Sequence, residues 1–170
     1  MHHGYLLSAW VCARAHGMME SAHHRTGKAA MTRDDTRWDD LDSLLLPDDD
    51  SSALDALLER VAAAGYPRQA LVPMLHVLEN NPHHDFGAPG DLVRAIEERR
   101  TDADYFDMLI ASVCRHPTEY NLWLMNRVMN TFDDDMAVKR GVAVFRQVES
   151  ESTDDGLKSA ARVFIENFDE

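Results

Sequence analysis

The chain has 170 residues, 45% of them hydrophobic, and its 17 basic and 30 acidic residues give a net charge of −13. This length suits one ordinary domain with a sizeable core, and no apolar run reaches the ~18–20 residues that a membrane span needs. The negative charge disfavours direct nucleic-acid binding, which depends on Lys and Arg to neutralise phosphates. It suits a basic partner, although solubility alone would also account for it.

The charge is unevenly spread, because residues 1–30 carry +2 and the remainder carries −15. Residues 4–15, GYLLSAWVCARA, faintly resemble a signal peptide, but no Lys or Arg precedes the apolar core. We therefore interpret residues 1–33 as a flexible tail or a mis-assigned start, with Met31 as the alternative start. Residues 34–170 are predicted to form a single all-α domain.

From residue 34 onward, apolar residues recur at helical spacing, and no stretch alternates long enough to indicate a strand. Ser52 is a candidate N-cap, and Gly65 is a candidate helix stop. Pro73 must kink or restart its helix, because it has no N–H to donate. The predicted helical stretches are 38–46, 48–65, 66–81, 89–100, 102–116, 117–130, 133–150 and 154–168.

The connections between these stretches are two to about eight residues long, as expected between antiparallel helix neighbours. Successive short hairpins without a heptad seam favour a stacked helical-pair solenoid of about six to seven antiparallel helices. The sequence shows no clean fixed-period repeat, so an irregular helical bundle is the alternative.

Residues 81–93, NPHHDFGAPGDLV, could form a metal site, a phosphate-binding loop or a connection between helices. The two adjacent histidines point in different directions on most backbones, and no spacing of ligands along one helix face supports a metal. The proline of the turn removes an N–H that a phosphate would use. We therefore expect an ordered loop with Phe86 in the core and with Gly87 and Gly90 supplying permissive backbone angles.

A polar stripe runs along residues 117–130 at steps of three and four. It consists of Glu119, Trp123, Asn126, Arg127 and Asn130. Such a stripe either ties helix layers together or forms a binding face, and Trp and Arg are enriched in binding hot spots. We assign Asn126, Arg127 and Asn130 to structure, and we keep Trp123 as a candidate anchor.

Acidic residues gather near the predicted helix starts, where capping and the helix dipole favour them. They include Asp48–Asp50, Asp102, Asp104, Asp107, Glu119, Asp133–Asp135 and Asp154–Asp155. Capping does not require three aspartates in a row, and helix starts in a stacked array can line one edge. No catalytic motif is present, and Cys12 and Cys114 have no metal-binding spacing. Cys114 is expected to be a buried thiol in a reducing cytosol.

Two stretches, LHVLENNPHHDFGAPGDLVRAIE and YFDMLIASVCRHPTEYNLWLMNRVMN, resemble a known family. They are similar to small helical immunity proteins of bacterial polymorphic-toxin and contact-dependent growth inhibition systems. The shared features are the Gly-x-Pro-Gly-x-Leu-Val turn at Gly87–Val93, the Ser-x-x-x-x-Pro-Thr step at Ser112–Thr118 and the Trp-x-Met-Asn-Arg-x-Met-Asn helix at Trp123–Asn130. The resemblance covers roughly residues 50–150. It implies a HEAT-like fold and a cognate inhibitor that binds the C-terminal domain of a toxin.

The sequence therefore predicts a cytoplasmic immunity protein that occludes a toxin domain, expected to be a nuclease, with its acidic surface. The expected partner-binding residues are Asp102, Asp104, Asp107, Glu119, Trp123, Asp133, Asp134 and Asp135. We expect no enzymatic activity, cofactor, metal, membrane contact or direct nucleic-acid contact. The alternative is a HEAT-like adapter without a toxin partner. A helical-repeat enzyme acting on nucleic acid, such as an alkyl-base glycosylase, would need a basic groove, which the charge disfavours.

Overall fold

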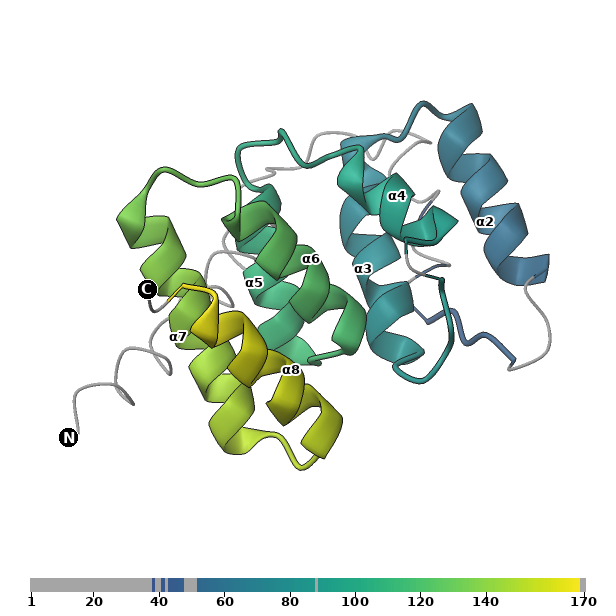
Figure 1. Ribbon diagram of the computed structural model, residues 1–170. Coiled ribbons are helices and arrows are strands. Elements are labelled where there is room, and N and C mark those ends of the chain that lie inside the picture. The colour runs from purple at the N-terminus through teal and green to yellow at the C-terminus, as the bar shows by residue number, and fades with distance from the viewer. Residues whose placement is uncertain (1–37, 39–40, 42, 48–51, 88, 169–170) are drawn as a thin grey trace, which may run out of the picture. The chain divides into compact units, whose positions relative to one another are not determined.

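Figure 1 shows the protein as a computed structural model, which describes residues 38, 41, 43–47, 52–87 and 89–168. The described residues form seven α-helices and one 3₁₀ helix, and they contain no strand. The elements are α2 (Ser52–Ala63), η3 (Arg68–Ala70), α3 (Leu71–Asn80), α4 (Asp91–Glu97), α5 (Tyr105–Arg115), α6 (Glu119–Met129), α7 (Asp135–Glu151) and α8 (Asp155–Glu166). The all-α prediction is confirmed. The predicted tail, residues 1–33, lies outside the described residues.

The chain divides into two compact units, and the boundary between them in the sequence falls between Tyr105 and Phe106, at the start of α5. Residues 28–105 belong to one unit and contain α2, η3, α3 and α4. Residues 106–170 belong to the other and contain nearly all of α5 together with α6, α7 and α8. We call them the first unit and the second unit and describe each by itself.

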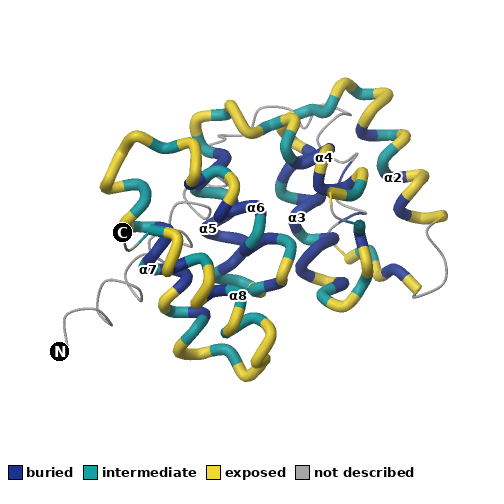
Figure 2. The backbone as a smooth tube through the Cα atoms, in the orientation of Figure 1, coloured by how far each residue is buried: buried dark blue, intermediate teal, exposed yellow. Residues whose placement is uncertain are grey.

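In the first unit, α3 is the most deeply buried helix, and it is buried along most of its length (Figure 2). Leu71, Leu75 and Leu78 recur along it at helical spacing, and all three are fully buried. Gly65 ends the preceding helical segment in the left-handed conformation, with φ of 73°, as a helix stop should. Pro73 lies in the first turn of α3. N–H groups in a first turn have no partner within the helix, so a proline there costs no hydrogen bond. The chain meets the constraint by forming η3 first and starting a new helix, so the predicted restart is confirmed.

The predicted helix over residues 38–46 is only partly described, and residues 44–47 are not helical. The buried side chain of Asn81 holds this stretch instead. Its Oδ1 accepts a hydrogen bond from the Leu46 N–H at 2.6 Å, and its Nδ2 donates to the Leu44 carbonyl at 2.9 Å and to the Val77 carbonyl at 2.8 Å. One amide therefore satisfies backbone groups that a helix would otherwise have paired.

Replacing Asn81 with alanine is expected to lower the free energy of unfolding by about 2–3 kcal/mol, because it leaves a buried N–H and buried carbonyls without partners. Chemical denaturation of the variant and of Asn130→Ala measures this. Asn130 is an exposed asparagine that likewise follows a helix, so its replacement should cost less than about 0.5 kcal/mol. Equal losses in the two variants would contradict the role of Asn81.

The loop between α3 and α4 connects the two helices and places Phe86 in the core, as the sequence indicated. Phe86 is buried, with 6% of its surface exposed, and Gly87 has φ of 78°. Gly90 has an ordinary φ of −78°, so the predicted need for a permissive angle is wrong at this residue. Its constraint is close approach, because a Cβ atom there would lie 1.4 Å from the carbonyl oxygen of Phe86.

In the second unit, four helices enclose a core centred on Phe145, which is fully buried. Consecutive helices run antiparallel, and the burial is concentrated along α5 and α6 (Figures 1 and 2). Gly141 of α7 lets α6 approach closely, since a Cβ atom there would lie 2.1 Å from the sulfur of Met129. None of the described helices is long and apolar enough to span a bilayer.

The turn between α5 and α6 is a hydrogen-bonded joint. Thr118 and Asn121 form a capping box, in which the Thr118 N–H donates to Asn121 Oδ1 at 2.8 Å and the Asn121 N–H donates to Thr118 Oγ1 at 3.2 Å. The Nδ2 of Asn121 also donates to Ser112 Oγ at 3.1 Å and to the His116 carbonyl at 3.0 Å. The Ser-x-x-x-x-Pro-Thr step therefore has a structural explanation of its own.

Candidate protein-binding surface

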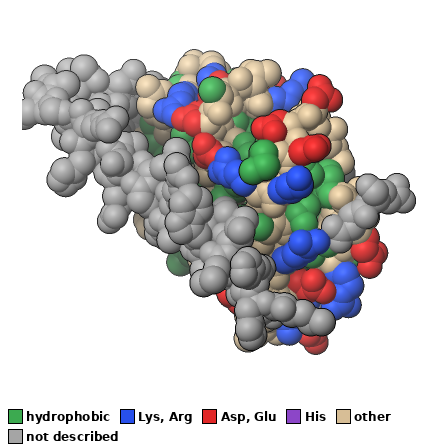
Figure 3. Space-filling view, turned by 90° about the vertical axis from the view of Figure 1, so that its left-hand side faces the viewer, with side chains coloured by type: hydrophobic (Ala, Val, Ile, Leu, Met, Phe, Trp, Pro, Cys, Tyr) green, Lys and Arg blue, Asp and Glu red, His purple; other side chains and the backbone are tan. Residues whose placement is uncertain are grey.

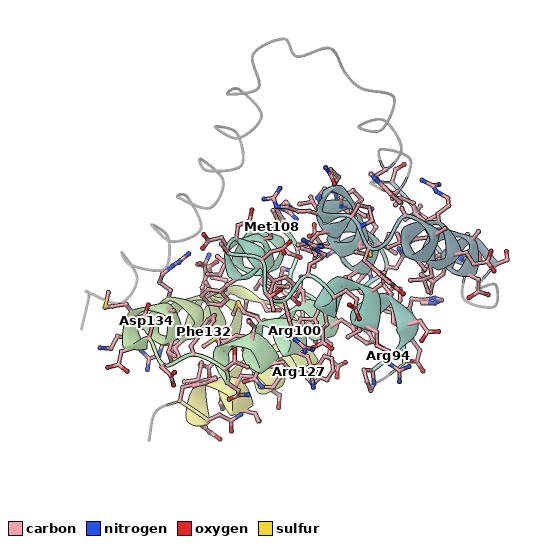
Figure 4. The ribbon with its side chains drawn as sticks, turned by 90° about the horizontal axis from the view of Figure 1, so that it is seen from above. Arg94, Arg100, Met108, Arg127, Phe132 and Asp134 are labelled. Atoms are coloured by element: carbon pink, nitrogen blue, oxygen red, sulfur yellow. The ribbon has the colours of Figure 1, made fainter. Side chains whose placement is uncertain are left out.

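The three aspartates Asp133–Asp135 lie where the α6–α7 loop enters α7, and all three are exposed. Asp134 is the N-cap, and its Oδ1 accepts a hydrogen bond from the Met136 N–H at 2.9 Å. Asp135 occupies the first turn, where the helix dipole favours a negative charge. Phe132 anchors the loop by stacking edge-on against Phe106, with ring centroids 4.8 Å apart. Figure 4 looks onto this end of the second unit and labels Phe132 and Asp134.

Met136 is the residue of this surface that the sequence reasoning missed. It follows the three aspartates directly, and 66% of its surface is exposed. Single exposed apolar side chains are normal on protein surfaces, and Leu45 is exposed to a similar degree. Met136 is therefore not a binding site by itself, and it matters here because it lies beside the three aspartates. We call Asp133, Asp134, Asp135 and Met136 together the α7-start surface. The only sequence signal for Met136 was its position just ahead of the apolar positions of α7.

Asp107 lies at the same end of the second unit but is engaged within the protein. Its Oδ1 accepts a hydrogen bond from Arg140 Nη2 at 2.6 Å, and the Arg140 guanidinium also lies 5.6 Å from the centre of the Phe106 ring. By contrast, none of Asp133–Asp135 forms an ion pair with a described residue. The acidic residues described at this end therefore differ in their ion pairing. Asp107 is neutralised by Arg140, whereas Asp133–Asp135 can still pair with a cation from another molecule.

Replacing Asp107 with asparagine should lower the free energy of unfolding by about 0.5–1 kcal/mol, since the pair with Arg140 is half-exposed and screened by solvent. Denaturation with and without 0.5 M salt checks this, because screening should narrow the gap between variant and wild type. A loss that does not change with salt would show that packing, not the ion pair, explains the effect.

Glu119 is exposed at the first position of α6, and it lies away from the α7-start surface. Successive antiparallel helices begin at alternate ends, so α5 and α7 start at one end of the unit and α6 and α8 at the other (Figure 1). The length of α6, roughly 15 Å, separates Glu119 from Asp133–Asp135. The second unit does not gather all its helix starts along one edge.

Trp123 lies on α6, between these two ends. It is half-buried, and the guanidinium of Arg127 lies 4.7 Å from the centre of its ring. Of the three residues that the sequence assigned to structure, Asn126 is buried, and Arg127 and Asn130 are exposed. Trp123 therefore presents a ring already covered in part by a cation.

Asp102 and Asp104 belong to the first unit, and both form ion pairs there. Asp102 accepts hydrogen bonds from Arg99 Nε at 2.8 Å and from Arg99 Nη2 at 2.6 Å, and its side chain is only 16% exposed. Asp104 pairs with Arg68. Of the eight residues that the sequence selected, the structure places Asp107, Glu119, Trp123 and Asp133–Asp135 in one unit.

The surface charge is mixed where Figure 3 displays it, since acidic and basic side chains alternate over that face. The net charge of −13 is thus not one continuous field on this face, and local groups of carboxylates decide what it can bind. Asp48–Asp50, the other aspartate run, lie outside the described residues. Among the described residues, no group of three or more His, Cys, Asp or Glu side chains is placed to hold a metal ion.

Cys114 is half-buried on α5 and is disulfide-bonded, so the predicted free thiol is wrong. The chain contains one other cysteine, Cys12, which lies outside the described residues.

No protein-family model, curated protein or solved structure matches the chain. The likeness to immunity proteins therefore rests on the sequence patterns alone, and the fold establishes only an all-helical protein.

Proposed function

We propose that this chain is an immunity protein that binds a cognate bacterial toxin domain, occludes it in a 1:1 complex and so neutralises it. The proposal includes the HEAT-like arrangement that the sequence resemblance implies. The observation that carries it is the α7-start surface, which places three exposed carboxylates beside an exposed methionine, and none of the three is paired with a basic residue in the described part of the chain.

These carboxylates exceed what the fold requires. One N-cap and one acid in the first turn account for Asp134 and Asp135, and comparable acids, Asp154 and Asp155, begin α8. Asp133 adds a third charge next to the first two, where like charges repel one another. A cluster that raises the energy of the free protein is explained if a positively charged partner later neutralises it.

A nuclease domain is the class of partner that fits this chemistry. Its active-site cleft is positively charged because it must bind phosphates. Carboxylates spaced along a loop can occupy such a cleft and can speed the encounter by electrostatic steering. Met136 would supply an apolar contact beside the charges, a role for which its adaptable side chain is suited.

The cytoplasmic location forms part of the proposal, since a nuclease acts on intracellular nucleic acid. The disulfide at Cys114 argues against it, because disulfides are rare in reducing compartments. Trapping free thiols with an alkylating agent before cell lysis tests this part separately. A cytoplasmic protein should be alkylated at Cys114 in cells, and a protein that is oxidised before lysis would contradict this location.

Growth rescue tests the proposed function. The C-terminal domain of the protein encoded next to this chain is induced in a bacterial host with and without the full-length chain. We expect the domain to stop growth and the chain to restore it, with a 1:1 complex on co-purification. If the domain is toxic and the chain neither rescues growth nor co-purifies, the immunity proposal fails and a HEAT-like adapter becomes the better explanation.

A further inference from the structure

Two residues of α5 hold the side chain of Arg140, which belongs to the second turn of α7. Its Nη2 donates to Asp107 Oδ1 at 2.6 Å, and its guanidinium lies 5.6 Å from the centre of the Phe106 ring. Phe106 in turn packs edge-on against Phe132, which directly precedes Asp133 in the sequence. A chain of contacts thus leads from Arg140 to the α7-start surface, although Arg140 itself pairs with a carboxylate outside that surface.

Without this pairing, Arg140 would be directed at the α7-start surface. Side chains of a helix point back toward its N-terminus, and residues four apart are neighbours on one face. Arg140 follows Met136 by four residues, so its guanidinium would extend toward the three aspartates, whose combined negative charge attracts it. An ion pair formed there would neutralise a charge that a basic partner would otherwise bind.

We propose that Asp107 is a positioning residue of the α7-start surface, because it holds Arg140 beside Phe106 and so keeps Asp133–Asp135 available to a cation from another molecule. The inference rests on the proposed function, in which that cation belongs to the toxin domain. Asp107 then contributes to partner binding through Arg140, whereas the sequence led us to expect that Asp107 contacts the partner itself.

Lys139 provides a comparison on the same helix. It follows Asp135 by four residues, is exposed, and forms no ion pair with any residue that the structure describes. The effect of Lys139 on the α7-start surface should therefore not depend on Asp107, whereas the effect of Arg140 should. Because both substitutions remove one positive charge from α7, Lys139→Gln is the matched control for Arg140→Gln.

Nuclear magnetic resonance of the full-length chain tests where Arg140 lies. The ion pair is half-exposed, so we expect Asp107→Ala to fold. In this variant, the Arg140 Nε–H signal and the backbone amide signals of Asp133 and Asp135 should shift, because the guanidinium leaves the Phe106 ring and approaches the aspartates. The backbone signals should return close to their wild-type positions in Asp107→Ala/Arg140→Gln, and they should not shift in Asp107→Glu, which keeps the carboxylate. Unshifted signals in Asp107→Ala, or shifts that persist in the double variant, would overturn the inference.

Titration with hexa-arginine at low salt, followed at the amide signals of Asp133 and Asp135, tests the consequence for binding. We expect Asp107→Ala to weaken binding at these residues by about threefold. Arg140→Gln should strengthen it by about threefold in the Asp107→Ala background but by less than about 1.5-fold in the wild type, whereas Lys139→Gln should have the same effect in both.

Two results of this titration would overturn the inference. Equal effects of Arg140→Gln in the two backgrounds would show that each charge acts independently, and a lack of binding at Asp133 and Asp135 would show that these carboxylates are not available to an outside cation. Because hexa-arginine takes the place of the toxin domain, the titration decides the role of Asp107 separately from the growth rescue, which decides the proposed function.

Discussion

Replacing Gly90 with alanine should lower the free energy of unfolding by about 3 kcal/mol. The added Cβ would lie 1.4 Å from the carbonyl oxygen of Phe86 and 2.6 Å from its carbonyl carbon. Both are backbone atoms, so no side-chain rotation relieves the overlap and the loop must move. Because Phe86 is buried and Gly90 precedes the first residue of α4, that movement disturbs the core of the first unit.

Gly156→Ala is the matched control for this substitution. Gly156 lies in the first turn of α8, and its added Cβ would meet only the Asp154 side chain, at 3.0 Å. Alanine is the better helix former by up to about 1 kcal/mol. The N-cap Asp154, whose Oδ1 accepts from the Leu157 N–H, must shift by a few tenths of an ångström to admit the Cβ. The two effects oppose each other, so this variant should stay within about 1 kcal/mol of the wild type. Urea denaturation of both variants measures the difference. If Gly90→Ala unfolds at the wild-type midpoint, the close approach does not explain the Gly-x-Pro-Gly turn.

The double substitution Asp133→Lys/Asp135→Lys should slow association with the toxin domain by at least about tenfold at low salt. It reverses two exposed charges that the fold does not pair, and it leaves the Asp134 cap intact. Electrostatic steering acts mainly on the association rate and weakens as salt is added. Stopped-flow mixing with the C-terminal domain of the neighbouring protein, over a range of salt concentrations, measures the rate.

The control for this prediction is a charge reversal at the start of another helix, α8. A double substitution there would remove the Asp154 N-cap, so the matched control is the single variant Asp155→Lys. Asp155 holds the same position in α8 that Asp135 holds in α7. Each single substitution therefore loses the same favourable interaction between a first-turn carboxylate and the helix dipole. We compare it with Asp135→Lys alone. Only the variant at the α7-start surface should slow binding, and equal slowing by both would show that net charge, not this surface, steers the partner.

Helix positions could be predicted from the sequence because they follow from local chemistry. Leu71, Leu75 and Leu78 recur at helical spacing, and Pro73 must either kink a helix or stand in its first turn, as it does here. The extended course of residues 44–47 could not be predicted in this way. That stretch is apolar enough for a helix, and its conformation depends on Asn81, which is more than thirty residues away in sequence.

The candidate surface could be predicted only in part, for a related reason. The sequence shows that aspartates gather at helix starts, but it does not show which of them have a cation beside them. Asp107 is paired by Arg140 from a helix two elements later, and Asp104 is paired by Arg68. The separation of Glu119 from Asp133–Asp135, by contrast, already follows from the predicted antiparallel arrangement, because antiparallel neighbours begin at opposite ends. The structure shows which of the eight candidates are ion-paired with described residues, and it adds Met136 beside Asp133–Asp135.

Titration calorimetry of the purified full-length chain with the C-terminal domain of its neighbouring protein tests the central claim most directly. The account predicts one-to-one binding with a Kd near or below about 10 nM, and it predicts an affinity that falls as salt rises. It also predicts that Asp133→Lys/Asp135→Lys weakens the complex. Absence of binding, or tight binding that is insensitive both to salt and to these two substitutions, would contradict it.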